Sequence, residues 1–361
     1  MGKIKLGKYI SEFSQKNRDK KPYPVYSVTN SSGFCTEYFT KDVSSEDKSN
    51  YKLVPYGYFA YNPSRINVGS VDCQDREDTV IVSPLYTVFS VSNKLNVNYL
   101  RYFFKSNYSK YLIKSKVSGS VRFNLKFSTL CNFEINEIGL EEQEKAVNLF
   151  SSIEDSIKTE EHELTLLDEL IKSRFNEMFS AFPKVELSQI SQIIMGQSPE
   201  STAYNDNGIG LPFFQGKADY GEKYTIVKHY TKKWNKEAKR GYVLMSVRAP
   251  VGPVNIASTD CAIGRGLCAM NAKPNKANNE FLYNALNSMQ QEIVLSGKDG
   301  STFAAINKDQ VYKLLLPQAP IELQNDFSEF VHRVDKLKFN VQKRIEKYKE
   351  LLNKKMDEYF N

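Results

Sequence analysis

The sequence lacks the residue patterns that characterise disulfide-stabilised or zinc-binding proteins. Its five cysteines are an odd number, are scattered without a C-x-x-C pair, and are accompanied by only three histidines. We therefore expect neither a disulfide framework nor a metal site. No apolar run approaches the ~18 residues of a membrane span, mean hydropathy is −0.48, and the first residues contain no apolar signal segment. These absences predict a cytoplasmic protein.

Glycine and proline are absent from two stretches, residues 140–180 and 321–361, although the chain contains 18 glycines and 13 prolines. These are the two residues that most often end or kink a helix. Each stretch is therefore predicted to form one long helix. The remaining stretches, residues 1–139 and 181–320, are interrupted by Gly, Pro, Asn and Ser every few residues and are predicted to be globular domains.

Both predicted helices carry apolar residues at alternating spacings of four and three. Starting from Ala146 and from Phe327, the steps meet eight apolar positions out of ten in each helix. A repeat of 3.5 residues sustained over this length is typical of a coiled coil. The alternative is that each helix is buried on its own globule, because extra apolar residues such as Leu149 and Leu166 widen the first stripe. The predicted seam residues are Phe150, Ile153, Ile157, Leu164, Leu167, Ile171 and Met178, and Val331, Val334, Val341, Ile345, Tyr348 and Leu352.

The chain is a tandem duplication with an offset of 181 residues. This offset carries residues 140–143 onto 321–324 and residues 177–179 onto 358–360 with similar sequences. The interval from about residue 20 to 97 needs a gap, and there Arg65 matches Arg248. Each unit is thus a globule followed by a helix, with the variable part in its middle.

The globules contain short β-favouring runs, such as residues 79–82, 86–89 and 242–247, and short helices are predicted at residues 98–114 and 278–295. We therefore predict an α/β protein, a tandem duplication of a mixed, β-rich α/β domain in which each copy is followed by a long helix. The two helices are predicted to pair as an antiparallel coiled coil that separates the two globules as a spacer.

Charge is distributed unevenly along the chain. Residues 141–169 contain ten acidic and two basic residues, whereas residues 333–355 contain nine basic and three acidic ones. The two helices therefore carry opposite net charges and are predicted to attract each other. The globules are both basic, with 20 Lys and Arg against 12 Asp and Glu in residues 1–139 and 16 against 11 in residues 181–320. Basic, aromatic-rich domains suit DNA binding, although lysine-rich surfaces also simply keep proteins soluble.

No catalytic motif is complete, and no catalytic residue is predicted. A phosphate-binding P-loop needs four residues between its glycines and Ser or Thr after the lysine. Gly210 and Gly216 have five residues between them, and Lys217 is followed by Ala218. The acidic residues near Lys223 lack the spacing of a metal-dependent nuclease.

Three strings in the second globule carry a family resemblance: LPFFQGKAD at residues 211–219, GYVLMSVRAPVG at 241–252 and AIGRGL at 262–267. They resemble the target-recognition domain of type I restriction-modification specificity subunits (HsdS), and the duplicated layout of globule and helix matches that family from end to end. The first globule departs more, since it has no clear counterpart of the FFQG or IGRG strings.

The resemblance implies a non-catalytic DNA-recognition subunit. Its two globules would each read one part of a bipartite, asymmetric site on double-stranded DNA. Its helices would dock two methyltransferase (modification) subunits that use S-adenosylmethionine, and endonuclease (restriction) subunits that use ATP and Mg would join the complex. No cofactor is expected in this chain itself.

Several residues are candidates for contacting DNA. Arg248 follows a strand-like run and has the planar group that suits a guanine edge or a phosphate, while a structural salt bridge is the alternative. Gln215 has an amide able to pair with adenine, and Arg265 lies between two glycines that permit close approach to a phosphate or form a tight turn. The complete candidate set is Arg65, Ser120, Arg122, Gln215, Lys217, Arg248, Arg265, Ser301 and Thr302.

Two other functions fit parts of the pattern. A non-enzymatic coiled-coil adaptor could use basic globules to bind an acidic protein, and it would show no salt-dependent DNA binding. A stand-alone DNA-binding regulator would act without a methyltransferase, but the sequence lacks a helix-turn-helix pattern. Neither alternative accounts for the duplicated unit as well as a divided DNA site does.

Overall fold

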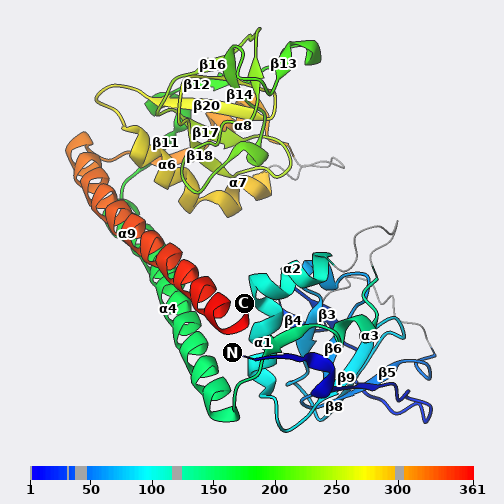
Figure 1. The fold of residues 1–361 in the computed structure, drawn as a ribbon. Helices are drawn as coiled ribbons and strands as arrows, with labels where there is room; N and C mark the ends of the chain where they lie inside the picture. Colours follow the sequence, from blue (N-terminus) through cyan, green and yellow to red (C-terminus); the bar gives the residue numbers. More distant parts are fainter. Residues whose placement is uncertain (1, 31, 37–46, 116–123, 297–304) are drawn as a thin grey trace. The chain divides into compact units, whose positions relative to one another are not determined.

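The computed structural model describes residues 2–30, 32–36, 47–115, 124–296 and 305–361. The chain divides into two compact units (Figure 1). The first consists of residues 1–161 together with 342–361, and the second of residues 162–341. Each unit therefore contains one globule and a part of each long helix.

The first globule is built around a four-stranded antiparallel sheet with the order β2 (Ile10–Phe13), β9 (Thr87–Val91), β6 (Phe59–Tyr61) and β7 (Val71–Cys73). Three strand pairs surround it: β1 (Lys3–Lys5) with β10 (Glu134–Asn136), β3 (Ser27–Thr29) with β4 (Gly33–Cys35), and β5 (Lys52–Pro55) with β8 (Thr79–Val82). Its helices are η1 (Leu6–Lys8), η2 (Ile66–Val68), α1 (Val97–Lys105), α2 (Asn107–Ser115) and α3 (Phe127–Leu130).

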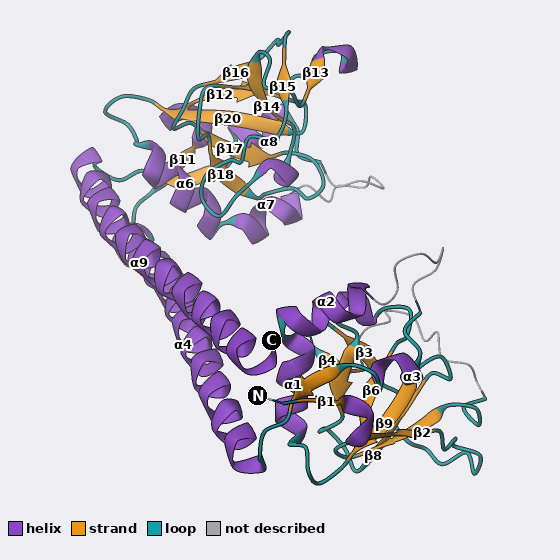
Figure 2. Cartoon of the chain, viewed as in Figure 1, coloured by secondary structure: helices purple, strands orange, loops and turns teal. Residues whose placement is uncertain are grey.

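The second globule repeats this plan and adds a second sheet, as the strands of Figure 2 show. Its antiparallel sheet has the order β12 (Ser191–Met195), β20 (Leu267–Ala272), β17 (Val243–Ser246) and β18 (Val254–Ile256), and β11 (Lys184–Glu186) pairs with β21 (Leu315–Pro317). The added sheet has the order β13 (Tyr204–Asn205), β15 (Tyr230–Thr231), β14 (Leu211–Phe214), β19 (Cys261–Ile263) and β16 (Glu237–Ala238). Its helices are α5 (Leu187–Ile190), η3 (Ser201–Ala203), η4 (Lys217–Asp219), α6 (Asn279–Ser288), α7 (Gln290–Ser296) and α8 (Lys308–Tyr312).

The two four-stranded sheets share strand order and register. In the first globule Ile10 lies opposite Val91, and in the second Ser191 lies opposite Ala272. Both residues of the second pair follow those of the first by 181 positions. The offset found in the sequence therefore also relates the hydrogen-bonded pairs β2–β9 and β12–β20. The predicted fold class is confirmed.

The short helix predicted at residues 98–114 is interrupted by Ser106. Ser106 adopts an extended conformation at the end of α1, and its hydroxyl donates to the carbonyl oxygen of Phe103 at 2.7 Å. The hydroxyl oxygen of Ser106 in turn accepts from the N–H of Ser109 at 3.1 Å and so caps α2. A serine that can satisfy the backbone groups of two helix ends favours a break over a continuous helix. The second predicted helix is also divided, at Met289, which ends α6 before α7 begins at Gln290.

Two long helices complete the fold, α4 (Leu140–Phe179) and α9 (Ile321–Phe360). A buried glutamine fixes the start of α4 to the first globule. Gln143 Oε1 accepts from the backbone N–H of Asn96 at 2.7 Å, and its Nε2 donates to the carbonyl oxygens of Lys94 and Ile138 at 3.3 and 3.0 Å.

The start of α9 is fixed in the same way. Gln324, which follows Gln143 by 181 residues, accepts from the N–H of Asn278 at 3.1 Å and donates to the carbonyl oxygens of Lys276 and Ala319 at 3.1 and 2.9 Å. Buried backbone groups need such partners because water cannot reach them. The repeated glutamine therefore has a structural reason, and it sets the direction in which each helix leaves its globule.

Each globule completes its hydrophobic core with residues from both long helices. In the first unit the core includes Phe150 from α4 and Phe360 from α9, whose rings pack against Tyr102 and Phe103 with centroids 5.0 and 5.6 Å apart. In the second unit it includes Phe175 and Phe179 from α4 together with Phe327 and Val331 from α9. Aromatic pairs of this kind contribute about 0.5–1.5 kcal/mol beyond the area that they bury.

The long helices pack antiparallel in both units. In the first unit Glu160 of α4 pairs with Arg344 of α9 at 2.7 Å, and Glu142 accepts from the hydroxyl of Tyr359 at 3.0 Å. In the second unit Asp168 pairs with Lys338 at 2.8 Å, and the rings of Phe175 and Phe327 meet with centroids 5.5 Å apart. In each unit the residue number along α4 decreases as the residue number along α9 increases, so the two helices run in opposite directions. The charge match seen in the sequence is therefore realised in contacts between the helices.

The predicted seam residues lie in the buried or half-buried stripe of the helices. Buried residues are Phe150, Ile153, Ile157, Leu167, Val331, Val334, Val341 and Ile345, and half-buried residues are Leu164, Ile171, Met178, Tyr348 and Leu352. Toward the end of each helix the buried positions shift to Phe175 and Phe179, and to Met356 and Phe360. This spacing of four follows the helix surface that faces a globule.

None of the helices in the described ranges combines the length and apolar character that crossing a membrane requires.

Candidate nucleic-acid interface

Two parallel strands bring predicted residues of the second globule together. β14 and β19 pair in parallel, with Phe214 opposite Ile263. Their carboxyl ends therefore meet at one edge of the sheet. The chain leaves β14 at Gln215 and leaves β19 at the turn 264–266, and the side chains of Gln215 and Arg265 are exposed there.

Arg265 lies between a glycine that the backbone requires, Gly266, and one whose surroundings are tight, Gly264. A Cβ atom on Gly266 would lie 2.3 Å from the carbonyl oxygen of Gln215, and one on Gly264 would lie 3.3 Å from the Cα of Gln215. The N–H of Gly264 donates to the carbonyl oxygen of Phe214 at 2.8 Å. The glycines thus allow the two loops to approach so closely that Arg265 and Gln215 share one surface.

A buried carboxylate shapes the loop that carries Lys217. Asp219 is 4% exposed, and its Oδ2 accepts from the backbone N–H groups of Gln215 and Gly216 at 2.7 and 3.3 Å. The side chains of Gln215 and Lys217 remain exposed. Because the carboxylate satisfies the backbone from within, the loop is fixed while its amide and ammonium groups stay in solvent.

Arg248 lies beside this edge. The N–H of Val247 donates to the carbonyl oxygen of Gly266 at 2.9 Å, and the hydroxyl of Ser246 donates to the carbonyl oxygen of Arg248 at 2.9 Å. The Arg248 side chain is exposed and forms no ion pair within the described ranges, so the salt-bridge alternative finds no support there. We refer to Gln215, Lys217, Arg248 and Arg265 together as the basic edge.

Arg65 occupies the matching loop of the first globule. The carbonyl oxygen of Pro63 accepts from the N–H of Leu125 at 3.0 Å, just as that of Val247 accepts from Ile306 at 3.0 Å in the second globule. Each loop ends in a left-handed glycine, Gly69 with φ 88° and Gly252 with φ 101°. The backbone framework is therefore shared, and Arg65 is exposed on it.

The first globule also contains a backbone counterpart of β14 that its sequence does not reveal. Val25 forms a parallel bridge with Ile81, and the N–H of Tyr26 donates to the carbonyl oxygen of Ile81 at 2.9 Å. The bridge repeats the pairing of β14 with β19. Since the side chains differ entirely from FFQG, a single-residue bridge of this kind leaves no pattern by which sequence reasoning could have found it.

The remaining candidates, Ser120, Arg122, Ser301 and Thr302, lie outside the described residues.

The basic edge has the chemistry of an anion-binding and base-reading surface rather than of a reactive centre. Arginine and lysine bind phosphate, and the amide of Gln215 can pair with adenine. Burial raises the pKa of the Cys73, Cys261 and Cys268 thiols to about 12, so these thiols are protonated at neutral pH and are not nucleophiles. Among the described residues no cluster of three or more His, Cys, Asp or Glu could hold a metal ion.

Comparison with known proteins assigns this architecture. The family model of the type I restriction modification DNA specificity domain matches residues 1–169 and again residues 180–350. The chain belongs to this family. A curated relative, the putative type I restriction enzyme MjaX specificity subunit of Methanocaldococcus jannaschii, is 28% identical over 356 residues, which cover 90% of this chain and 83% of the relative.

Solved structures agree with this assignment. A chain from a structural study of complex assembly and conformational transition of the type I R-M system is 26% identical, with a TM-score of 0.70, over 100% of this chain and 97% of that chain. The type I restriction-modification S subunit of M. genitalium shares the fold at 14% identity, with a TM-score of 0.53 over 100% of this chain and 96% of that chain. The two globules are therefore DNA specificity domains in tandem, and they are carried by a type I specificity subunit.

Proposed function

We propose that the two DNA specificity domains each read one part of a bipartite, asymmetric site on double-stranded DNA. The observation that carries this proposal is a shared backbone framework with different exposed residues. The loop of Arg65 and the loop of Arg248 have matching hydrogen bonds. Among the described residues of the first domain, however, the counterpart of the FFQG strand is the single Val25 bridge. The same scaffold with different side chains at its edge suits two different half-sites.

The helices are proposed to dock two methyltransferase subunits. Leu170 of α4 and Leu351 of α9 are related by the 181-residue offset, and both are exposed, at 46% and 40%. A single exposed leucine is common on protein surfaces, so the support comes from its recurrence at the equivalent position of the second helix. Two equivalent leucines in two equivalent half-units support two copies of one partner.

The chemistry is proposed to reside in those partners. Adenine methylation would use S-adenosylmethionine bound to the methyltransferase, and cleavage would use ATP and Mg bound to the endonuclease subunits. This chain would contribute the DNA sequence at which the methyltransferase acts.

Methylation mapping tests the proposal. The purified chain alone is expected neither to methylate nor to cleave DNA, and addition of its methyltransferase partner is expected to produce methylation at one bipartite sequence across a genome. Methyl transfer by the chain alone, or methylation whose sequence does not depend on this chain, would contradict the proposal.

The adaptor alternative is tested in the same preparation. A DNA-reading subunit should bind duplex DNA with an affinity that falls steeply with salt concentration, because phosphate contacts release counterions. A chain that assembles with the methyltransferase but shows no salt-dependent DNA binding would be an adaptor.

A further inference from the structure

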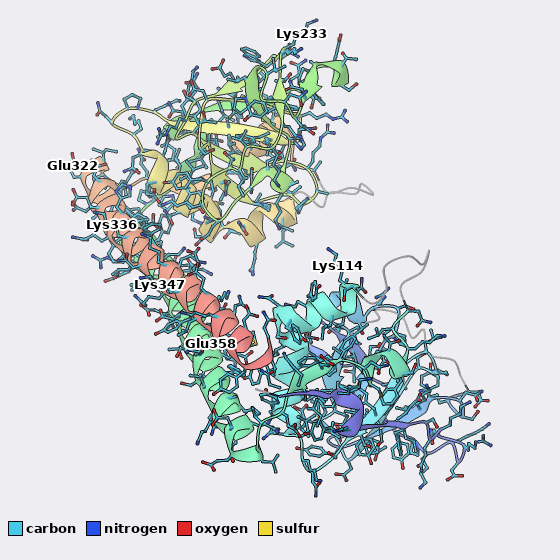
Figure 3. All side chains as sticks on the ribbon, in the orientation of Figure 1. Lys114, Lys233, Glu322, Lys336, Lys347 and Glu358 are labelled. Atoms are coloured by element: carbon cyan, nitrogen blue, oxygen red, sulfur yellow. The ribbon has the colours of Figure 1, made fainter. Side chains whose placement is uncertain are left out.

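The loop between β15 and β16 forms a compact basic surface of the second globule. Its five residues, Lys232, Lys233, Trp234, Asn235 and Lys236, are all exposed, and Trp234 is 43% exposed. Trp234 is the single tryptophan of the chain, and residues 226–236 contain four lysines and no acidic residue. Figure 3 shows Lys233 at the outer surface of its globule.

The loop is fixed at both ends. The buried Thr231 donates its hydroxyl to the carbonyl oxygen of Lys233 at 2.6 Å, and the N–H of Lys232 donates to the carbonyl oxygen of Ala203 at 3.1 Å. At the other end, the carbonyl oxygen of Lys236 accepts from the N–H of Ile263 at 3.1 Å. Because these bonds hold the backbone, the loop does not have to be ordered on binding, which lowers the backbone part of the entropic cost.

Nearby acidic groups do not neutralise the loop. Glu237, the next residue in the chain, forms an ion pair with Lys239, and Asp260 pairs with the same Lys239 at 3.1 Å. Lys232, Lys233 and Lys236 form no ion pair within the described part of the chain. The three ammonium groups of this loop are therefore available to bind an anionic partner.

The loop shares its supporting strands with the basic edge. Lys236 is hydrogen-bonded to Ile263, two residues before Arg265, and the carbonyl oxygen of His229 accepts from Phe213, two residues before Gln215. Lys228, between the two regions, donates to the carbonyl oxygen of Ala218 at 2.5 Å, beside Lys217. Lys236 therefore lies beside the turn of Arg265, whereas Lys232 lies by Gly210, at the opposite end of β14 from Gln215. The loop thus extends from the basic edge toward the start of β14.

We propose that the loop 232–236 is a second DNA-contacting element of this domain, which binds the sugar-phosphate backbone of duplex DNA next to the bases that the basic edge reads. Lys232, Lys233 and Lys236 bind phosphates, and the indole of Trp234 packs against the sugars. The inference rests on the proposed DNA-reading function. It assigns to the loop affinity without sequence preference, since phosphate contacts position a protein but do not specify bases.

The test is DNA binding by the full chain in complex with its methyltransferase, measured over a range of salt concentrations. The variant carries Lys232→Gln, Lys233→Gln and Lys236→Gln. The matched control carries Lys184→Gln, Lys276→Gln and Lys313→Gln, three exposed lysines of the same globule that form no ion pair within the described ranges. Both variants lose three positive charges, so the change in net charge is the same in the two. The probes are a duplex with the mapped site and a duplex of random sequence.

Each phosphate contact contributes about 0.9 to the slope of log affinity against log salt. The loop variant is therefore expected to lose about 2–3 from this slope and to bind both duplexes roughly tenfold or more weakly near 0.15 M salt, with the methylated sequence unchanged. The control should keep the slope of the wild type. Trp234→Ala should weaken binding to both duplexes without changing the slope, and Trp234→Phe should restore part of the affinity.

The outcomes separate this inference from the function on which it rests. If the wild type shows no salt-dependent binding to either duplex, the proposed function fails. If the wild type binds but the loop variant keeps its slope, or if the control loses as much as the loop variant, the inference fails. If the loop variant binds DNA normally but no longer assembles with the methyltransferase, the loop is a protein-docking surface and the inference is overturned.

Discussion

Arg248 is the residue whose role a single substitution can settle. It is exposed at the end of β17, next to Gly266 and Arg265, without an ion pair in the described ranges. If it reads a base edge, Arg248→Ala should cost ~1–3 kcal/mol and relax one position of the second half-site. Methylation sequencing gives the preferred site, and Arg240→Ala, which removes another exposed arginine of the same globule, is the control. Equal weakening on all sequences would instead assign Arg248 to a phosphate.

The two units use different residues at one equivalent point of contact between globule and helix. Glu154 of α4 accepts from the hydroxyl of Tyr102 and from Lys105, at 2.9 and 2.8 Å. Asp335, its counterpart 181 residues later in α9, accepts from Lys223 at 2.6 Å. Lys223 is only 15% exposed and also pairs with Glu280 at 2.9 Å. The acid is repeated, whereas the donor comes from a different part of each globule.

Replacing Lys223 should therefore destabilise the second unit. Lys223→Met leaves Glu280 and Asp335 without their cation, and removal of one partner of a buried ion pair costs about 3–5 kcal/mol. Because Asp335 is 30% exposed and can recruit water, we expect about 2–3 kcal/mol. Urea unfolding of wild type and variant measures the difference, and Lys313→Met, at an exposed position, is the control. A difference no larger than that of the control would show that the ion pairs do not stabilise the unit.

The pH dependence of this difference has a definite sign. Burial lowers the pKa of Lys223, but the charges and hydrogen bonds of Glu280 and Asp335 outweigh burial and raise it above its ordinary value. A lysine with a raised pKa in the folded state contributes fully below its unfolded pKa of about 10.4 and loses that contribution as pH rises through the folded pKa. The stability gap between wild type and Lys223→Met should therefore stay constant from pH 7 to about 9.5. A gap that already narrows in this interval would contradict the raised pKa.

The elements differ in how far the sequence predicts them. The long helices follow from the absence of glycine and proline and from the apolar repeat. Their last turns do not follow the predicted seam, because Phe179 and Phe360 face a globule, and only the tertiary structure determines that contact. Strands of two or three residues, such as β13 and β16, are stabilised by partners far away in the chain and carry little local signal.

The candidate site was also predictable from the sequence only in part. Arg248, Gln215 and Arg265 could be selected because glycines or strand-like runs flank them in the sequence. The convergence of their loops depends on the parallel pairing of β14 with β19, which joins segments about 50 residues apart. The carboxylate of Asp219 that holds the loop of Gln215 was not predicted, since only the structure shows that it is buried.

At the scale of the helices, length can be tested as a determinant of the DNA site. If the helix pair measures the distance between the two half-sites, insertion of four residues within 151–175 and of four within 332–356 adds ~6 Å at ~1.5 Å per residue. Since a base pair rises ~3.4 Å, the unread spacer should lengthen by about one to two base pairs while both half-sites stay the same. A seven-residue insertion in each helix keeps the apolar repeat in phase and should disturb packing less. An unchanged spacer in an active variant would mean that the helices dock the partner but do not measure DNA.

At the scale of the whole molecule, the duplication predicts independent half-sites. Replacement of residues 1–139 with the first globule of another specificity subunit should change one half of the methylated sequence and leave the other intact. The replacement must keep aromatic residues that can pack on Phe150 and Phe360, because both helices complete the first core. Methylation sequencing of cells with the chimera gives both half-sites. A change in both halves at once would refute separate reading.

The first unit contains the C-terminal part of the chain, and this affects the order in which the protein can fold. Residues 342–361 belong to the first unit, and within it the ring of Phe360 packs on Tyr99 with centroids 4.8 Å apart, while Lys3 donates to the carbonyl oxygen of Phe360 at 3.0 Å. A ribosome makes these residues only after it has made the entire second unit. The globule synthesised first is therefore completed last, and until then its aromatic core remains open on one side to chaperones or to another copy of the same helix.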